Sequence, residues 1–202
     1  MGYDLVTMLK ESFDGHFQAP VEAWAEYASY CEIIEAENET ILKRKNRPET
    51  NFYFIISGCV GLFLPTRSND VCLDFAFERN FCADYMSVVT HQATPLEMRC
   101  IERSVMAGMP VKKFRELGNT PIGMQLMRVS AEASFVDKQQ QQIDLLTKSA
   151  AVRLAELELR LPGISNRVAQ KYIASYLGIT PQSLSRIRKS EYRSKLPFGK
   201  SV

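Results

Sequence analysis

A twenty-residue segment near the C-terminus, QKYIASYLGITPQSLSRIRK (residues 170–189), limits most strongly what this chain can fold into. Ala174 is the small residue that two closely crossing helices need, and Gly178 can adopt the left-handed backbone of a tight turn. Thr180 then supplies an N-cap, and Pro181 a first helical residue whose missing N–H costs no hydrogen bond. The spacing predicts a helix-turn-helix, held together by the apolar residues Ile173, Leu177, Ile179, Leu184 and Ile187.

The second helix of this motif presents a polar face away from its buried residues. Such side chains suit duplex DNA, because arginine can donate two hydrogen bonds to guanine and glutamine can pair with adenine. Residues near the start of a recognition helix point most directly into the major groove, so we expect base contacts from Gln182, Ser183 and Arg186. The predicted DNA contacts are Lys171, Gln182, Ser183, Ser185, Arg186, Arg188 and Lys189, with Arg167 and Arg193 as further phosphate contacts.

Charge is distributed unevenly along the chain. The 202 residues include 25 basic and 23 acidic side chains, a net +2 that by itself argues against a polyanionic partner. Residues 148–202, however, hold 11 basic and 3 acidic groups, whereas residues 1–147 hold 14 and 20. The basic third contains the predicted helix-turn-helix, which favours a DNA-facing role for that part alone. A helix pair with a merely solvated basic face is the alternative interpretation.

The first two-thirds of the chain has a different pattern. Residues 1–30 carry apolar side chains every three or four positions, which predicts helix. Residues 31–111 contain short runs rich in β-branched and aromatic residues, separated by turn residues such as Ser57-Gly58. This pattern is typical of an antiparallel barrel or jelly roll. We expect strands at 31–36, 40–44, 51–57, 60–64, 71–77, 96–102 and 105–111.

A long helix should begin at Thr120-Pro121, which is again an N-cap followed by a first-turn proline. Seven of its residues are spaced alternately by four and three positions: Ile122, Leu126, Val129, Ala133, Val136, Gln140 and Ile143. This seam favours a two-stranded coiled coil, and thus a homodimer, in which a buried Gln140 sets the register. The alternative is a helix laid against the barrel. A further helix over 149–161 should end before Pro162-Gly163.

With these segments in order, the chain resembles the cyclic-AMP receptor protein/fumarate–nitrate reduction regulator (Crp/Fnr) family. The likeness is carried by NFYFIISGCVGLFL (51–64), which matches a family hairpin, by PVKKF (110–114), and by the helix-turn-helix. It implies an α+β fold with a double-stranded β-roll (jelly roll) that senses an effector (1–118), a dimerisation helix (119–147) and a DNA-binding domain (148–202). It also implies a cytoplasmic bacterial transcription regulator whose homodimer binds pseudo-palindromic double-stranded DNA, with RNA polymerase as a further partner and no membrane contact.

Two departures from the family pattern affect these expectations. The family's cyclic-nucleotide pocket uses a Gly-Glu pair and then an Arg-Ser/Thr pair, whereas this chain has Ala83-Asp84 and Thr94-Pro95. Without that arginine a buried phosphate lacks its charged partner, so we do not expect cyclic AMP, and the sequence names no other cofactor. Residues 164–169 are also too few for the β-hairpin wing of many members. The expected pocket for a small-molecule effector consists of Ala83, Asp84, Tyr85, Thr94, Pro95 and Arg99.

Other classes of function find little support in the sequence. The five cysteines show no CxxC spacing and indicate free thiols rather than a disulfide framework or metal site. His16 and His91 have no evident nucleophile or carboxylate partner, and the sequence contains no glycine-rich phosphate loop. We therefore expect that the protein is not an enzyme. No apolar run approaches the roughly 20 residues of a membrane span. The second functional hypothesis is a ligand-binding sensor module whose helix-turn-helix contacts proteins rather than DNA.

Overall fold

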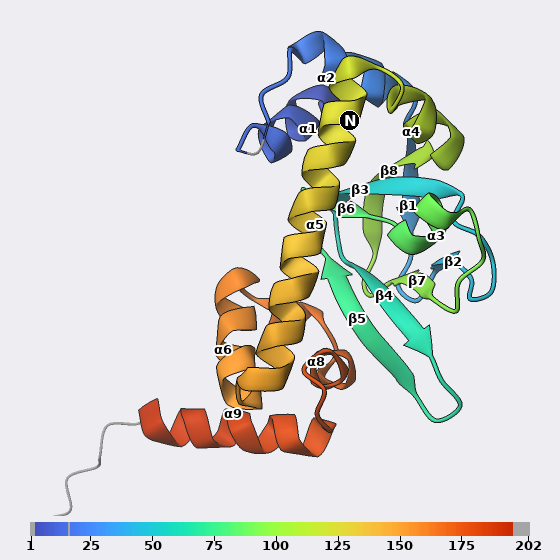
Figure 1. Cartoon of the computed structure of the whole chain (residues 1–202). Helices are drawn as coiled ribbons and strands as arrows, with labels where there is room; N and C mark the ends of the chain where they lie inside the picture. The colour runs from blue at the N-terminus through green and yellow to red at the C-terminus, as the bar shows by residue number, and fades with distance from the viewer. Residues whose placement is uncertain (1–2, 16, 196–202) are drawn as a thin grey trace, which may run out of the picture.

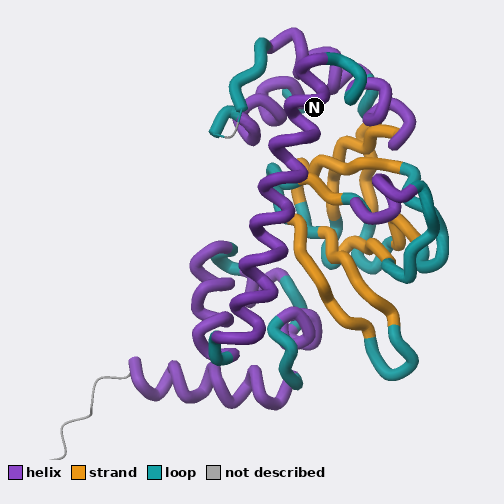
Figure 2. Tube along the Cα trace, viewed as in Figure 1, coloured by secondary structure: helices purple, strands orange, loops and turns teal. Residues whose placement is uncertain are grey.

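The computed structural model describes residues 3–15 and 17–195, with side chains through residue 190. His16 and the side chain of Arg193 therefore lie outside the described part. The elements follow the expected order: N-terminal helices, a set of short strands, one long helix and a C-terminal group of helices (Figures 1 and 2). The fold is α+β, as predicted.

The strands form two four-stranded antiparallel sheets, which make up the β-roll. The expectation of many short antiparallel strands over residues 31–111 is confirmed, and β6 is a two-residue strand that the sequence pattern did not reveal. One sheet has the order β1 (Glu32–Ala36), β8 (Ser104–Pro110), β3 (Asn51–Ser57), β6 (Phe81–Cys82). The other has the order β2 (Ile41–Lys43), β7 (Glu97–Cys100), β4 (Val60–Pro65), β5 (Asp70–Ala76).

Helices cover the roll at one end, where α1 (Leu5–Phe13), α2 (Val21–Ser29) and α4 (Val111–Leu117) gather in Figure 1. The expected helical region over residues 1–30 is thus two helices, because Pro20 is the N-cap of α2 and separates it from α1. The fully buried Trp24 packs its ring 5.1 Å from that of Phe13. A short helix within the roll, α3 (Tyr85–Thr90), was not anticipated.

The long helix α5 (Pro121–Thr147) has 27 residues and therefore spans about 40 Å. Its predicted start is confirmed, since the Thr120 hydroxyl accepts a hydrogen bond from the Gly123 N–H at 3.0 Å. One side of α5 runs along β5, where the Gln141 amide donates to the Leu73 carbonyl at 3.2 Å. The helix thereby links the roll to the C-terminal helices (Figure 2).

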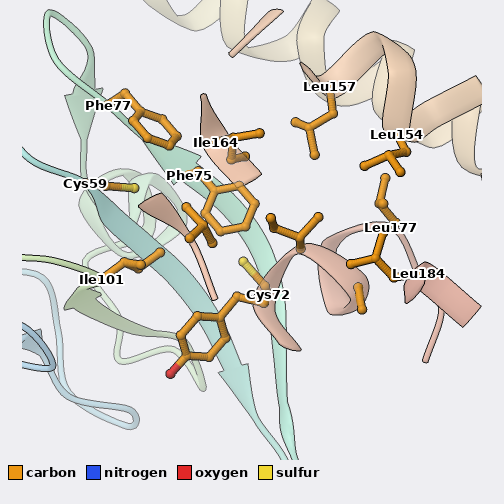
Figure 3. Packing of buried hydrophobic residues seen from close by; sticks show 14 of the residues in the cluster. Cys59, Cys72, Phe75, Phe77, Ile101, Leu154, Leu157, Ile164, Leu177 and Leu184 are labelled. Carbon is orange, nitrogen blue, oxygen red and sulfur yellow. The ribbon is translucent and has the colours of Figure 1, made fainter. Parts of the chain in front are cut away.

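The C-terminal part consists of α6 (Ala150–Arg160), α7 (Ile164–Arg167), α8 (Gln170–Tyr176) and α9 (Pro181–Lys195). The predicted stop after α6 is confirmed, and Gly163 has the left-handed φ of +82° that this break requires. Residues 164–169 hold the short helix α7, and the described residues after β8 form no strand that could serve as a wing. Side chains of the roll and of these helices share one core, drawn in Figure 3.

Candidate nucleic-acid interface

The helix-turn-helix forms as the sequence predicts, with α8 as its first helix and α9 as its second. Gly178 has a φ of +66° in the turn, and the Thr180 hydroxyl accepts the Ser183 N–H at 3.2 Å to cap α9. Ala174 is completely buried, which lets the two helices approach closely. The predicted locking residues Ile173, Leu177 and Leu184 are buried, and Ile179 and Ile187 pack against the same core.

The first helix of the motif is anchored to the roll. The Ser175 hydroxyl accepts the Cys72 N–H at 2.9 Å and donates to the Asp70 carbonyl at 3.2 Å, so α8 is bonded to the backbone of β5. Tyr172 donates its hydroxyl to the Glu39 carboxylate at 3.0 Å. Because α8 is held on its inner side, α9 forms the outer edge of the molecule, away from the roll (Figure 1).

The outward face of α9 is polar and accessible. Gln182, Arg186 and Lys189 are exposed, whereas Ser183 and Ser185 are half-buried. Lys171, on α8, is also exposed, and its ammonium lies 4.5 Å from the centre of the Tyr172 ring. These side chains can meet a duplex without rearrangement of the core.

Two of the arginines predicted to contact phosphates form hydrogen bonds and ion pairs within the chain. Arg188 donates to the Ser165 hydroxyl at 2.6 Å and lies 3.7 Å from the Glu158 carboxylate, which ties α9 to α6 and α7. Arg167 donates to Glu78 at 2.6 and 2.9 Å and also pairs with Glu102, which ties α7 to the roll. Both guanidinium groups position the helix-turn-helix within the chain.

A buried polar cluster occupies the expected effector pocket. The Lys43 ammonium donates to the Asp84 carboxylate and to the Thr94 hydroxyl, both at 2.7 Å, and to the Leu96 carbonyl at 2.8 Å. Thr94 also donates to Asp84, and the Asp84 carboxylate caps α3 by accepting the Ser87 N–H at 3.1 Å. The structure thus brings together Asp84 and Thr94, which the sequence analysis placed in one pocket. Their side chains bond to the Lys43 ammonium of the same chain.

Glu49 completes this cluster from the loop before β3. Its carboxylate accepts the Asp84 N–H at 2.9 Å and the Thr50 N–H at 3.0 Å. Burial raises the pKa of Glu49, and the backbone hydrogen bonds only partly offset this. Sequence reasoning missed both Lys43 and Glu49, because Lys43 and Asp84 are separated by 41 residues and no local pattern joins them.

The remaining pocket candidates lie in different surroundings. Ala83 packs with the apolar cluster beneath α1 and α2, Tyr85 lies edge-on to Phe52 with ring centres 6.5 Å apart, and Pro95 is exposed. The Arg99 guanidinium pairs with Asp70 and lies 4.3 Å from the centre of the Phe63 ring and 5.5 Å from that of Tyr172. Arg99 therefore contributes to the junction with α8 rather than supplying a cation beside Asp84.

The predicted dimer seam lies largely uncovered on α5. Ile122, Leu126 and Val129 are half-buried, whereas Ala133, Val136, Gln140 and Ile143 are exposed. Gln140 donates to Asp144 at 2.6 Å within its own helix. The seam pattern missed Phe135 and Leu146, which are 67% and 76% exposed and enlarge the apolar surface of α5. A single chain thus leaves several large apolar side chains of α5 exposed to solvent.

The described helices include none long and apolar enough to cross a membrane. Among the same residues, no three or more histidine, cysteine or acidic side chains gather as a metal site would require. Burial raises the pKa of the Cys31 thiol to about 12, and all five cysteines are free, so these thiols remain protonated at neutral pH.

The described part of the chain combines a β-roll, a long helix and a helix-turn-helix in this order. No protein-family model matches the chain, and no curated protein sequence matches it. Solved structures do. FixK2 from Bradyrhizobium japonicum has a TM-score of 0.70 at 14% identity, over 85% of this chain and 89% of that one. CLP from Xanthomonas campestris, a c-di-GMP responsive global regulator, has a TM-score of 0.66 at 14% identity, over 90% and 96%.

A third similar structure comes from Eubacterium rectale and is assigned to the transcriptional regulators of the Crp/Fnr family. Its TM-score is 0.67 at 14% identity, over 90% of this chain and 88% of that one. The chain has the fold of the Crp/Fnr regulators, which confirms the resemblance seen in the sequence.

Proposed function

We propose that this protein is a homodimeric DNA-binding transcription regulator whose α9 enters the major groove. The observation that carries the proposal is the contrast between the two helices of the motif. α8 is bonded to the roll, whereas the polar face of α9 is exposed at the edge of the molecule. A recognition helix needs this arrangement, because its base-reading side chains must project beyond a rigid support.

Within this proposal the exposed residues have separate roles. Gln182, Ser183 and Arg186 read base edges, since they lie in the first turns of α9. Lys171 and Lys189 contact phosphates, where their charge needs no fixed geometry. Ser185 and Arg188 support these contacts. To contact DNA itself, the Arg188 side chain would have to give up its hydrogen bond to Ser165.

Homodimerisation through α5 is the second component of the proposal. The exposed apolar side chains of α5 are covered when a second copy packs its seam against the first. Two recognition helices then face adjacent major grooves, so the operator should be pseudo-palindromic. RNA polymerase is the partner we propose for the DNA-bound dimer.

Cyclic AMP is not the effector in this proposal. The Lys43 ammonium already fills the space between Asp84 and Thr94, with every strong acceptor there engaged. A cyclic nucleotide would have to displace a side chain that is 2% exposed and break its ion pair.

The base-reading role is tested by selecting a preferred duplex and measuring binding of Arg186→Ala. Loss of a bidentate arginine should cost about 1–3 kcal/mol on the selected duplex and little on random DNA. Lys189→Ala should weaken binding to both duplexes alike, and Arg103→Ala, on the exposed surface of the roll, to neither. Equal losses on both duplexes for Arg186→Ala would refute its reading role.

A salt titration separates DNA binding from the protein-contact alternative. Phosphate contacts release counterions, so the affinity for duplex should fall steeply as salt increases. Absent or salt-insensitive duplex binding would favour a helix-turn-helix that contacts proteins.

The dimer is tested by sedimentation of Val136→Asp. A carboxylate in the seam should shift the protein to monomers, whereas Ser134→Asp, at an exposed position of α5 outside the seam, should leave the dimer intact. A wild-type monomer at micromolar concentration would contradict this part of the proposal.

A further inference from the structure

A groove of about 600 Å³ lies where the roll, the long helix and the helix-turn-helix meet. Its walls come from β5, the C-terminal half of α5, α6, and the end of α8 with the turn that follows. Its volume is in the range of pockets that hold small molecules. The groove is separate from the buried cluster around Lys43, with which it shares no residue.

The two lysines of this groove are neutralised by neighbouring carboxylates. Lys138 lies 2.5 Å from Asp74, and Lys148 lies 3.0 Å from Asp144 and 2.7 Å from Glu156. Four of these five charged side chains line the groove, and the fifth, Asp74, lies beside it. The ion pairs leave neither lysine available as a strong anion ligand.

Two arginines of the groove differ from the lysines, because the acceptors of their hydrogen bonds are neutral oxygens. Arg160 donates to the Tyr176 hydroxyl at 2.8 Å. Arg153 donates to the carbonyls of Lys148 at 2.5 Å and Leu177 at 2.6 Å, and its Nε is buried with no partner among the described residues. Asp137 is the one further carboxylate in the lining, which therefore holds four basic and three acidic side chains, and Asp74 beside it brings the total charge to zero. Arg153 and Arg160 are the cations of the groove whose hydrogen bonds involve no carboxylate.

Apolar side chains, with the neutral polar side chains of Gln140, Gln141, Gln142 and Ser175, make up most of the remaining lining. Leu73 from β5, Leu145 from α5 and Leu157 from α6 line the groove together with Leu177 and the Tyr176 ring. Leu157 and Leu177 both belong to the shared core, where Figure 3 shows Leu154 between them. A ligand that fits must therefore combine an anionic group with an apolar body.

We propose that this groove binds a small amphipathic organic anion, with Arg160 and Arg153 holding the anionic group and the leucines and Tyr176 holding the body. The regulatory consequence rests on the proposed DNA-binding function. Arg153 ties the end of α5 to the carbonyl that precedes Gly178, so a ligand here touches the turn of the helix-turn-helix directly. Occupancy shifts the orientation of α9 to the extent that the ligand prefers one orientation over another.

The probe for this test is 8-anilinonaphthalene-1-sulfonate, an amphipathic aromatic sulfonate whose fluorescence rises on binding. Its neutral counterpart N-phenyl-1-naphthylamine has the same body without the charge. Titration of the full-length protein should give saturable binding of one sulfonate per chain, with much weaker binding of the neutral dye. No DNA is present in this experiment, so its result does not depend on the proposed function.

Variants locate the site of the dye. Arg160→Gln should raise the Kd of the sulfonate about tenfold, the effect of losing one charge-assisted contact. Arg128→Gln, which removes an exposed arginine of α5 paired with Glu132, is the matched control and should leave the Kd unchanged. Leu73→Trp, which fills the groove from β5 without changing its charge, should also weaken binding.

Three results would overturn the groove as a binding site. These are the absence of saturable sulfonate binding, an equal affinity for the neutral dye, and a Kd that neither Arg160→Gln nor Leu73→Trp changes. If the dye binds as expected, a saturating amount should change the Kd for duplex in the wild type but not in Arg160→Gln. An unchanged Kd would refute the regulatory role alone, and a protein that binds dye but no duplex would count against the proposed function.

Discussion

The ion pair between Lys43 and Asp84 is the most deeply buried charge interaction in the described part of the chain, with side chains 2% and 0% exposed. Lys43→Met keeps most of the volume of the side chain but removes the ammonium. The Asp84 carboxylate then loses its charged partner in a site that water does not reach. Breaking a buried pair from one side costs about 3–5 kcal/mol, because the remaining charge is left uncompensated.

This loss is measured by urea unfolding at a fixed protein concentration, since the stability of the proposed dimer would depend on concentration. With an m-value of about 2 kcal/mol/M, the midpoint should fall by about 1.5–2.5 M. Arg103→Met is the control. Its ion pair with Glu35 joins side chains that are 66% and 61% exposed, so the midpoint should hardly change.

A double variant distinguishes charge from packing. In Lys43→Met/Asp84→Asn the buried charges are removed together, and asparagine can still cap α3. The double variant should therefore be more stable than Lys43→Met alone, with a coupling energy of about 2–3 kcal/mol. Strictly additive losses would refute the view that the two charges stabilise each other.

Two further changes test the turn and the roll junction. Gly178→Ala should lower the free energy of unfolding by about 1–2 kcal/mol, because φ is +66° and the new Cβ would lie 3.3 Å from Leu145. Gly163→Ala, where a Cβ meets nothing within 4 Å, should lower it by less when both are measured by thermal unfolding. Equal losses would show that the positive φ alone sets the cost. Burial raises the pKa of Glu78, but hydrogen bonds from Arg167 and the Gly58 N–H outweigh it, so the folded-state pKa lies below 4.5. The resulting stability is present above that value and is lost as the pH falls. Because the Glu78 side chain is 37% exposed and solvent screens the pair, Arg167→Gln should lower stability by only about 0.5–1 kcal/mol at pH 7. It should also flatten the decline between pH 5 and 3, and an unchanged slope would contradict this origin.

The sequence determined those features of the protein whose causes are local. A left-handed turn at Gly178, the caps at Thr120 and Thr180, and the short alternating strands follow from backbone preferences of neighbouring residues. The polar face of α9 could be predicted for the same reason, since helical spacing fixes which side chains point away from Leu184. The family resemblance rested on these segments and on their order.

Tertiary structure alone decided where the charged residues act. Lys43 meets Asp84 from 41 residues away, and Arg167 meets Glu78 across 89 residues, because strands and helices distant in sequence pack together. Arg99 and Arg188, expected in an effector pocket and on DNA, each form ion pairs or hydrogen bonds within the described part of the chain. Charge acts over distance in space rather than in sequence, so composition could locate a basic region but only the packed chain shows which of its charges remain free.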